Sequence, residues 1–475
     1  MELKTTILFL ISSIPFGYFE LVTETTNDFI DLVKQPYYVD KSYLVLEFLH
    51  HRNEQNFITY PRQFGKTVNI KMLKTFFQAE VNSSGHIKPY NQTNAYEIFK
   101  SSKLFQNHPD VIRDHMAQYP VLFFDFKLNI TKEITRQQVV RILNERISQS
   151  FSEYEWMRNV ELDDVSECST VPELVNLIDG NLNEHELKYS ILSFSIMLQK
   201  YFKRQVIVLV DDYDYAFLNA VYDFDHIYDR SHGIHRYYDL INVMLGLAFH
   251  DDKKHIDFAL LTGVGGKIFT ENDPFNTLEY CHFLDDSHFF TPYFGFNKEE
   301  LDDLLHRYNC TKQDRSSISK YYKGYYTNTR HTLMYNPYSI IRYLQSKKKS
   351  DRPGVMSGYW VEEEKSKFIP LVLQVPEFRQ VLKAIVEGHD SIDMSDDKPN
   401  KKAIFETFYN NILVWGVPVE KSDLEDLFRF LFDLGYLSFK GKEPKLCIPN
   451  NEIGDFLKSK LNDDSKKTAD ESESE

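Results

Sequence analysis

The 475-residue sequence has few cysteines, which can form disulfides, and few glycines and prolines, which interrupt helices and strands. Its four cysteines lie far apart, with no CxxC pair and no zinc-ligand spacing, so buried reduced thiols are expected rather than a disulfide scaffold or a zinc module. Glycine and proline number only 18 and 17, which excludes collagen-like and low-complexity chains. The sequence also lacks an internal repeat of 20–50 residues, which excludes solenoids and propellers.

Common hydrolase signatures and an excess of basic charge are missing as well. Neither H-E-x-x-H nor G-x-S-x-G occurs, and no Cys/His arrangement is recognisable by local spacing. The chain carries 55 Lys and Arg against 70 Asp and Glu, and the net charge of −15 disfavours nucleic acid as a partner. What the chain has in abundance is 37 Phe and 30 Tyr, which predict large aromatic cores.

The N-terminus contains a short apolar stretch with two interpretations. Residues 5–16 follow Lys4 and are too few to span a bilayer. Their length suits the core of a signal peptide, but no clean A-x-A-like cleavage site follows, and the same residues could form the first element of the fold. Residues 1–20 therefore leave a secreted and a cytoplasmic location equally open, and no transmembrane span is expected.

Four apolar runs without alternation predict strands covered on both faces: residues 57–60, 121–126, 206–210 and 258–264. Between them, apolar residues recur every three to four positions over residues 68–77 and 139–151, as in amphipathic helices. Strands that alternate with helices predict a parallel sheet with flanking helices. We expect this α/β domain to span residues 21–296.

Helix signals dominate the C-terminal half and predict a mostly helical lid or docking region over residues 297–462. Asn297 and Glu300 form a capping box before one apolar-periodic segment. Asn336 followed by Pro337 is a typical helix start.

The end of the chain predicts a helix, a hairpin and a tail. Ser422 and Glu425 can cap a helix that Gly435 terminates, and two short apolar segments then read as a two-stranded hairpin. A helix followed by a hairpin resembles a winged-helix element. Residues 463–475 contain no large apolar side chain and predict a disordered acidic tail.

The segment over residues 57–77 is the most informative about chemistry, because an apolar strand runs through a loop ending in Gly65-Lys66-Thr67 into an amphipathic helix. A helix start exposes unpaired N–H groups, Gly65 lets the backbone approach a phosphate, Lys66 neutralises phosphate charge, and the Thr67 hydroxyl can ligate Mg²⁺. The first glycine of the full Walker A pattern is replaced by Tyr60. A plain strand–turn–helix corner is the alternative.

A second constellation follows the third predicted strand, where Asp211, Asp212 and Asp214 appear in the sequence VIVLVDDYD. In a Walker B motif the first carboxylate holds Mg²⁺ and the next acid polarises the attacking water. The alternative is that the three acids begin a turn. Thr262, at the end of the fourth predicted strand, could sense the γ-phosphate, although the glycines after it are more simply a tight turn.

Taken together, these segments resemble the AAA-ATPase-like family, a group of degenerate P-loop proteins often fused in bacteria to a restriction-endonuclease-like domain. The resemblance spans nearly the whole ordered chain and implies a P-loop NTPase-type parallel sheet for the α/β domain. It rests on YVDKS (38–42), PRQFGKT (61–67), VDDYD (210–214), LTGV (261–264), FGF (294–296), YKGY (322–325), YNPYS (335–339), YW (359–360), GYL (435–437) and IPN (448–450).

The chain departs from the family pattern at positions that affect turnover. Tyr60 and Gln63 replace two positive charges of the phosphate loop, although Arg62 is kept, and Asp212 stands where the family usually has Glu. Shortening a water-positioning acid can cost about 10²-fold in rate. The resemblance therefore implies nucleotide binding more than vigorous hydrolysis, and no nuclease domain is expected after residue 450.

The resulting hypothesis is a Mg²⁺–ATP-binding protein with slow hydrolysis. Arg62, Gly65, Lys66 and Thr67 would bind the nucleotide, Thr67 and Asp211 would hold the metal, and Asp212 and Thr262 would act in catalysis. The alternative is a catalytically inactive interaction protein with the same fold, secreted if the leader is cleaved. The residues identify neither the protein partner nor a preference between adenine and guanine.

Overall fold

The structure is a computed structural model in which thirteen parts of the chain are described. They are residues 28–52, 54–82, 85–129, 134–159, 174–222, 227–250, 255–265, 278–348, 354–363, 368–389, 392–393, 420–440 and 445–472. The N-terminal apolar stretch and Cys168 lie outside them. Cys281 is a buried free thiol, and Cys310 and Cys447 are free thiols that are only partly buried.

The centre of the molecule is a five-stranded parallel sheet in the order β2-β3-β4-β1-β5. Its strands are β1 (Gln55–Thr59), β2 (Val121–Asp125), β3 (Val206–Asp211), β4 (Ile256–Gly263) and β5 (Glu279–Cys281). The four predicted strands are confirmed. The short edge strand β5 was missed because it exposes Glu279 and so has no continuous apolar run.

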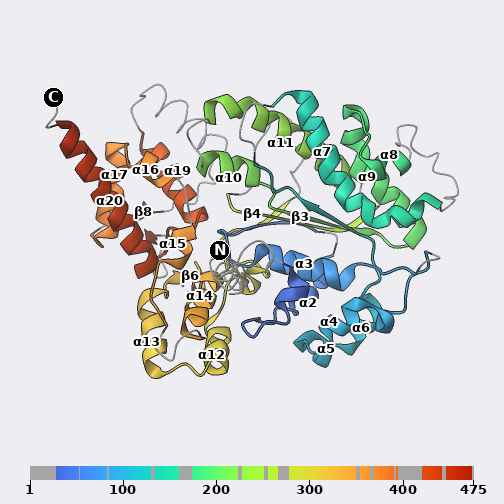
Figure 1. The fold of residues 1–475 in the computed structure, drawn as a ribbon, viewed down its shortest axis with the longest axis horizontal. Helices are drawn as coiled ribbons and strands as arrows, with labels where there is room; N and C mark the ends of the chain where they lie inside the picture. Colours follow the sequence, from blue (N-terminus) through green and yellow to red (C-terminus); the bar gives the residue numbers. More distant parts are fainter. Residues whose placement is uncertain are drawn as a thin grey trace, which may run out of the picture.

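Helices cover both faces of the sheet, as the uninterrupted apolar strands predicted (Figure 1). One face carries α3 (Lys66–Phe77) with α2 (Leu44–His50) beyond it, and the other carries α7 (Arg136–Phe151), α9 (Glu184–Phe202) and α11 (Ile227–Phe249). The remaining helices of this half are α1 (Phe29–Leu32), α4 (Asn94–Phe99), α5 (Lys103–Asn107), α6 (Pro109–His115), α8 (Leu174–Asp179) and α10 (Tyr215–Tyr222).

The strand order places several loops at one edge of the sheet. From β1 the chain crosses to β2 at the far side, returns through β3 and β4, and adds β5 on the other side of β1. The loops that follow β1, β3 and β4 therefore lie side by side at the carboxyl edge of the sheet. This is the point where the strand order reverses. Open parallel sheets bind their ligands at this position.

The C-terminal half is mostly helical, as predicted, and lies at the left of Figure 1. Its helices are α12 (Lys298–Arg307), α13 (Lys312–Tyr321), α14 (Pro337–Lys348), α15 (Tyr359–Glu363), α16 (Phe368–Val372), α17 (Pro376–Val386), α19 (Lys421–Asp433) and α20 (Asn451–Ser472). Short strands β6 (Tyr325–Tyr326) and β7 (Leu333–Met334) form one small sheet. A second contains β8 (Ile392–Asp393), β9 (Ser438–Phe439) and β10 (Lys445–Cys447).

Helix caps confirm one sequence prediction and correct another. At α12 the Asn297 side chain accepts a bond from Glu300 N while Glu300 accepts one from Asn297 N, both at 2.9 Å. The predicted box of Ser422 and Glu425 is wrong by two residues, because α19 starts at Lys421 and its reciprocal cap joins Glu420 and Asp423. A carboxylate can accept the same N–H hydrogen bonds as a hydroxyl, so the acidic pair can cap the start of the helix.

The end of α19 follows the prediction. Gly435 adopts a φ of 91°, and Gly435 N and Tyr436 N bond back to the last turn, so the glycine terminates the helix. The hairpin of β9 and β10 is present. Whether this end functions as a winged helix stays a prediction.

The C-terminal tail differs from the sequence prediction, because α20 continues as helix to Ser472 instead of ending before a disordered segment. Residues 463–472 contain neither glycine nor proline, and Asp463 and Lys467 have the four-residue spacing that supports a helix. No helix in the described parts of the chain combines the length and apolarity needed to cross a bilayer.

Candidate functional site

The loop from β1 to α3 (residues 60–65, the β1–α3 loop) bends through two residues with positive φ. Gln63 has φ of 65° and Gly65 has φ of 93°, and Gly65 is the N-cap of α3. A Cβ placed on Gly65 would meet no atom within 4 Å, so the space beside the helix start is open. The first N–H groups of a helix are unpaired within the helix, and such a start suits an anion.

Lys66 is buried and its ammonium lies over its own loop. Its Nζ donates to the carbonyl oxygens of Tyr60 at 2.7 Å and Pro61 at 2.9 Å. Burial lowers the pKa of Lys66, and the carboxylates of residues 211, 212 and 214 act in the opposite direction. The fold therefore brings the lysine of the first motif within electrostatic range of the acids of the second.

Asp211 connects three elements at the carboxyl edge of the sheet. It is buried at the end of β3, and its Oδ1 accepts a hydrogen bond from Thr262 Oγ1 on β4 at 2.5 Å. Burial raises the pKa of Asp211, and the side chains of Thr262 and Thr67 oppose that effect. The fold therefore brings Thr67 and Asp211, the predicted metal-binding pair, to one place.

Asp212 has a strained backbone and a raised pKa. Its φ is 52°, in the left-handed region that non-glycine residues rarely adopt, and its N–H donates to Thr262 Oγ1 at 3.4 Å. Burial and the charge of Asp211 raise the pKa of Asp212 to about 7, while Lys66 opposes the shift. A carboxyl group with this pKa can accept a proton near neutral pH.

Asp214 belongs to the architecture of the turn after β4. Its carboxylate accepts bonds from Val264 N at 2.8 Å and Gly265 N at 2.7 Å. A Cβ on Gly263 would come within 2.9 Å of Asp214 Oδ1. The carboxylate of Asp214 therefore stabilises the turn after the neighbouring strand β4, which is a structural role.

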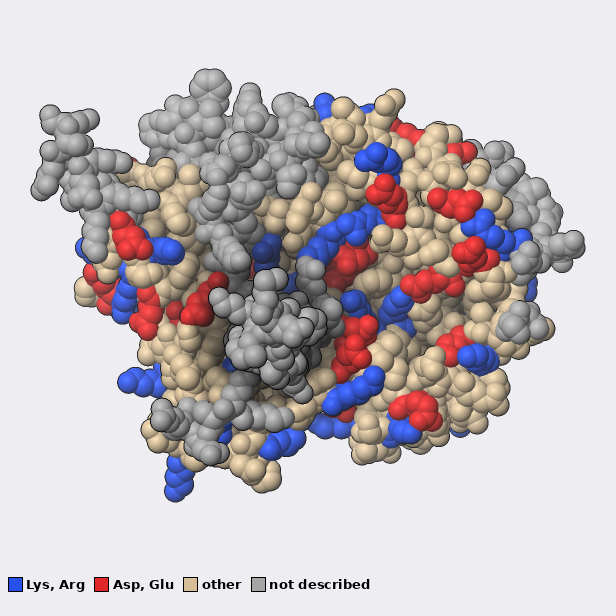
Figure 2. Space-filling model, viewed as in Figure 1, with Lys and Arg blue, Asp and Glu red and all other residues tan. Residues whose placement is uncertain are grey.

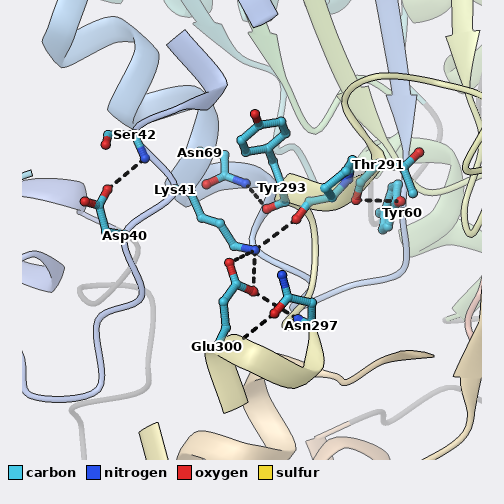
Figure 3. A network of polar contacts seen from close by, with 10 residues as sticks. Asp40, Lys41, Ser42, Tyr60, Asn69, Thr291, Tyr293, Asn297 and Glu300 are labelled. Carbon is cyan, nitrogen blue, oxygen red and sulfur yellow. Dashed lines mark hydrogen bonds and ion pairs between the residues drawn. The ribbon is translucent and has the colours of Figure 1, made fainter. Parts of the chain in front are cut away.

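The side chains at positions 60, 62 and 63 point to different surroundings. Tyr60 is buried, its ring packs against Phe283 and Phe294, and its hydroxyl donates to Thr291 O at 3.4 Å (Figure 3). Position 60 is therefore part of the aromatic core. The Arg62 guanidinium carbon is 5.5 Å from the centre of the Tyr215 ring, and Gln63 is exposed.

Sequence reasoning missed Asp125, the last residue of β2. It is the register partner of Asp211, and its charge raises the pKa of both Asp211 and Asp212. An acid inside the apolar run VLFFDF was the available signal. Even so, the described residues contain no group of three or more His, Cys, Asp or Glu side chains placed to hold a metal ion.

A cavity of about 190 Å³ lies beside the β1–α3 loop, and its walls come from four parts of the sequence, within residues 29–41, 63–72, 293–296 and 337–341. Gly65, Val68 and Asn69 line it from the loop and α3, Tyr38 from the preceding segment, and Tyr338 from α14.

A polar network fixes the walls of this cavity (Figure 3). Lys41 Nζ contacts Glu300 at 2.6 Å and donates to Pro292 O at 3.0 Å, so the segment before β1 is tied to α12. Asn69 Nδ2 donates to Tyr293 O at 2.8 Å. The YVDKS motif therefore joins the α/β domain to the helical half beside the β1–α3 loop.

Residues far along the chain, from the end of the α/β domain and from the C-terminal half, contact the β1–α3 loop. Trp360 Nε1 donates to Arg62 O at 3.2 Å, and Gly295 N donates to Phe64 O at 3.0 Å. A Cβ on Gly435 would come within 2.9 Å of Pro61. The shape of the loop is thus coupled to the position of the helical half.

The model of the AAA-ATPase-like family, described as a predicted AAA-ATPase, matches residues 25–272, which contain the loop, both strand-end acids and Thr262. The chain belongs to this family. Membership and the five-stranded sheet support a P-loop ATPase-like fold, and the family description suggests nucleotide binding. No curated protein sequence matches the chain.

Three solved structures show distant similarity. The Walker-type ATPase of Pyrococcus abyssi is 12% identical and covers 88% of this chain and 94% of its own, with a TM-score of 0.42. ORC2 of Aeropyrum pernix, solved as ADPNP and ADP complexes, is 10% identical over 92% and 98%, with a TM-score of 0.37. Cdc6p of Pyrobaculum aerophilum is 12% identical over the same shares, with a TM-score of 0.30.

Proposed function

We propose that the protein binds ATP with Mg²⁺ at the β1–α3 loop and hydrolyses it slowly. The observation that carries the proposal is that Lys66 and Thr67 at the start of α3 lie beside the acids at the end of β3, because P-loop chemistry needs the two motifs together. In this role Lys66 exchanges its two loop carbonyls for phosphate oxygens. Gly65 leaves the phosphates the space beside the helix start.

The available ligands fit Mg²⁺ in this setting. Mg²⁺ is commonly held by one or two carboxylates together with phosphate oxygens and water, and it does not need an all-protein cage. The Thr67 hydroxyl and the Asp211 carboxylate would supply the protein ligands, which agrees with the absence of a larger ligand cluster among the described residues. When bound, the metal neutralises phosphate charge.

Asp212 and Thr262 are the proposed catalytic groups. Asp212, with its pKa near 7, would accept a proton from the attacking water, and Thr262 would position the acids through its bonds to Asp211 and Asp212 N. The shorter side chain of Asp212 in place of Glu supports slow turnover.

The cavity beside Asn69 is the proposed site of the base. It is lined by Gly65 and by residues of the first turns of α3, next to the phosphate-binding residues. Its aromatic and aliphatic walls suit a planar ring. Arg62 would contribute positive charge from the loop, although its guanidinium now lies over Tyr215.

Calorimetry with ATP, with and without Mg²⁺, tests the proposal. We expect wild-type protein to bind more tightly with Mg²⁺ and the Lys66→Ala variant to lose at least tenfold in affinity, because charge-assisted bonds to phosphate contribute about 1.5–3 kcal/mol each. Lys71→Ala, on the same helix, is the matched control and should bind like wild type. Equal affinity in the Lys66 and Lys71 variants would refute the proposal.

The second candidate is an interaction protein that keeps the fold without catalysis. It is favoured by two of the departures from the family pattern, the buried, core-packed Tyr60 and Asp212. Phosphate release distinguishes the candidates, because an ATPase loses activity in the Lys66→Ala variant, whereas the inactive protein shows the same background rate in both.

A further inference from the structure

The amino edge of the sheet, opposite the β1–α3 loop, carries a second hollow that the proposed function does not use. Its volume is about 550 Å³, within the range of small-molecule sites. The turns before β1, β2 and β3 meet there, together with the ends of α6 and α9. The lining residues are Arg52, Asp114, His115, Tyr119, Gln199, Lys203, Arg204 and Gln205.

The hollow has an excess of positive charge in a chain of net charge −15. Arg52 is paired with Asp257, and Asp114 with Arg113, so both acids at this edge already have a partner. Lys203 and Arg204 make no ion pair with a carboxylate in the parts of the chain that the structure describes. Three cations line the hollow, Arg52, Lys203 and Arg204, and they outnumber Asp114, the acid in its lining, so the hollow suits an anion.

The fold sets the backbone of Lys203 and the side chain of Arg204. Lys203 caps the end of α9 with a φ of 55°, a left-handed conformation that turns the chain directly into β3. The Arg204 guanidinium carbon lies 4.8 Å from the centre of the Tyr119 ring, which orients its plane. Tyr119 in turn shares a hydrogen bond of 2.6 Å with His115 Nδ1.

We propose that this hollow is a second phosphate site, which takes a small phosphate-containing molecule independently of the β1–α3 loop. Lys203 and Arg204 would bind the oxygens, and Tyr119 and His115 would add hydrogen bonds. A compact multivalent oxyanion matches the guanidinium and ammonium donors. A long nucleic-acid backbone would require an extended basic surface, whereas basic and acidic side chains alternate over the described face in Figure 2.

Calorimetry of the full chain with inorganic pyrophosphate in Mg²⁺-free buffer tests the proposal. The Lys66→Ala background removes the contribution of the β1–α3 loop, and we expect one binding site to remain in it. Adding Lys203→Gln or Arg204→Gln should weaken this site by about tenfold or more. Adding Lys188→Gln, which removes a positive charge from the same helix α9, should leave it unchanged.

Nuclear magnetic resonance of His115 gives a second measurement. Burial and the charges of Arg52 and Arg204 lower the pKa of His115, whereas the charges of Asp114 and Asp257 raise it. A bound phosphate adds negative charge and should therefore raise this pKa. The same rise in the Lys66→Ala chain and none in the Arg204→Gln chain is expected. If Arg204→Gln does not fold, the exposed Lys203 variant gives the same comparison.

Three results would overturn the proposal: no heat in the Lys66→Ala background, equal weakening by the Lys188 variant, or binding of a single-stranded oligonucleotide without binding of pyrophosphate. The last would indicate a nucleic-acid surface. Failure of ATP binding at the β1–α3 loop would leave pyrophosphate binding in the Lys66→Ala chain unaffected, so the two proposals fail separately.

Discussion

Replacement of Glu452 by Gln should remove a large part of the pH dependence of folding. Glu452 is buried at the start of α20, where it accepts bonds from Trp360 N and Ser339 Oγ, both at 2.8 Å. Burial, opposed by these two bonds, raises its pKa from 4.5 to about 7. The folded chain therefore keeps this proton up to about pH 7, whereas the unfolded chain releases it near pH 4.5.

The sign and size of the effect follow from that difference. Between about pH 4.5 and 7 the folded state binds more protons than the unfolded state, so the free energy of unfolding falls as the pH rises, by up to about 3 kcal/mol from this group. Above pH 7 the contribution is constant. Below about pH 4.5 Glu452 is protonated in both states, and the free energy of unfolding keeps its full value from this group.

Urea denaturation at pH 5 and pH 8 measures the effect. Wild-type protein should lose more stability than Glu452→Gln over this interval, by about 1–3 kcal/mol, and the variant should be the more stable protein at pH 8. Glu377→Gln, at an exposed position of α17, should behave like wild type. An identical loss in wild type and the Glu452 variant would refute the reasoning.

Two further predictions concern the loop and its acids. Gly435→Ala should destabilise the fold by about 1–3 kcal/mol more than Gly388→Ala, because both glycines have positive φ but only Gly435 lies against Pro61, and chemical denaturation of the two variants checks this. If Asp212 accepts the proton from water, phosphate release should rise with pH through about 7 in wild type and stay low and flat in Asp212→Asn, whereas equal profiles would exclude that role.

The central sheet was predictable because its strands carry their own signal. Residues of β3 and β4 are buried throughout, and a strand covered on both faces has to be apolar at every position. The edge strand β5 is exposed at Glu279 and buried only at Cys281, and its three residues are too few for a pattern to be recognised.

The candidate site was predictable in part for a related reason. Gly65, Lys66, Thr67 and Asp211 are set by the ends of strands, and strand ends in a parallel sheet lie together. Asp125 was missed because the sequence of a single strand does not show which other strand it will pair with in the sheet.

The contacts of the C-terminal half were also beyond sequence reasoning. Trp360 reaches the Arg62 carbonyl from a helix almost 300 positions later in the chain, and no local pattern encodes such a pairing. The cap of α19 was misplaced because two neighbouring polar pairs both suit a helix start, and only the folded geometry selects Glu420 and Asp423.

The contacts between the two halves have a consequence for truncation of the protein. Carbonyl groups of the β1–α3 loop find donors on Gly295 and Trp360, and Pro61 rests against Gly435. A fragment cut after residue 296 would keep every residue of both motifs yet lose the donor on Trp360 and the wall at Gly435. The motif-bearing part is therefore not an interchangeable module, and any exchange of the C-terminal half between relatives has to preserve these contacts.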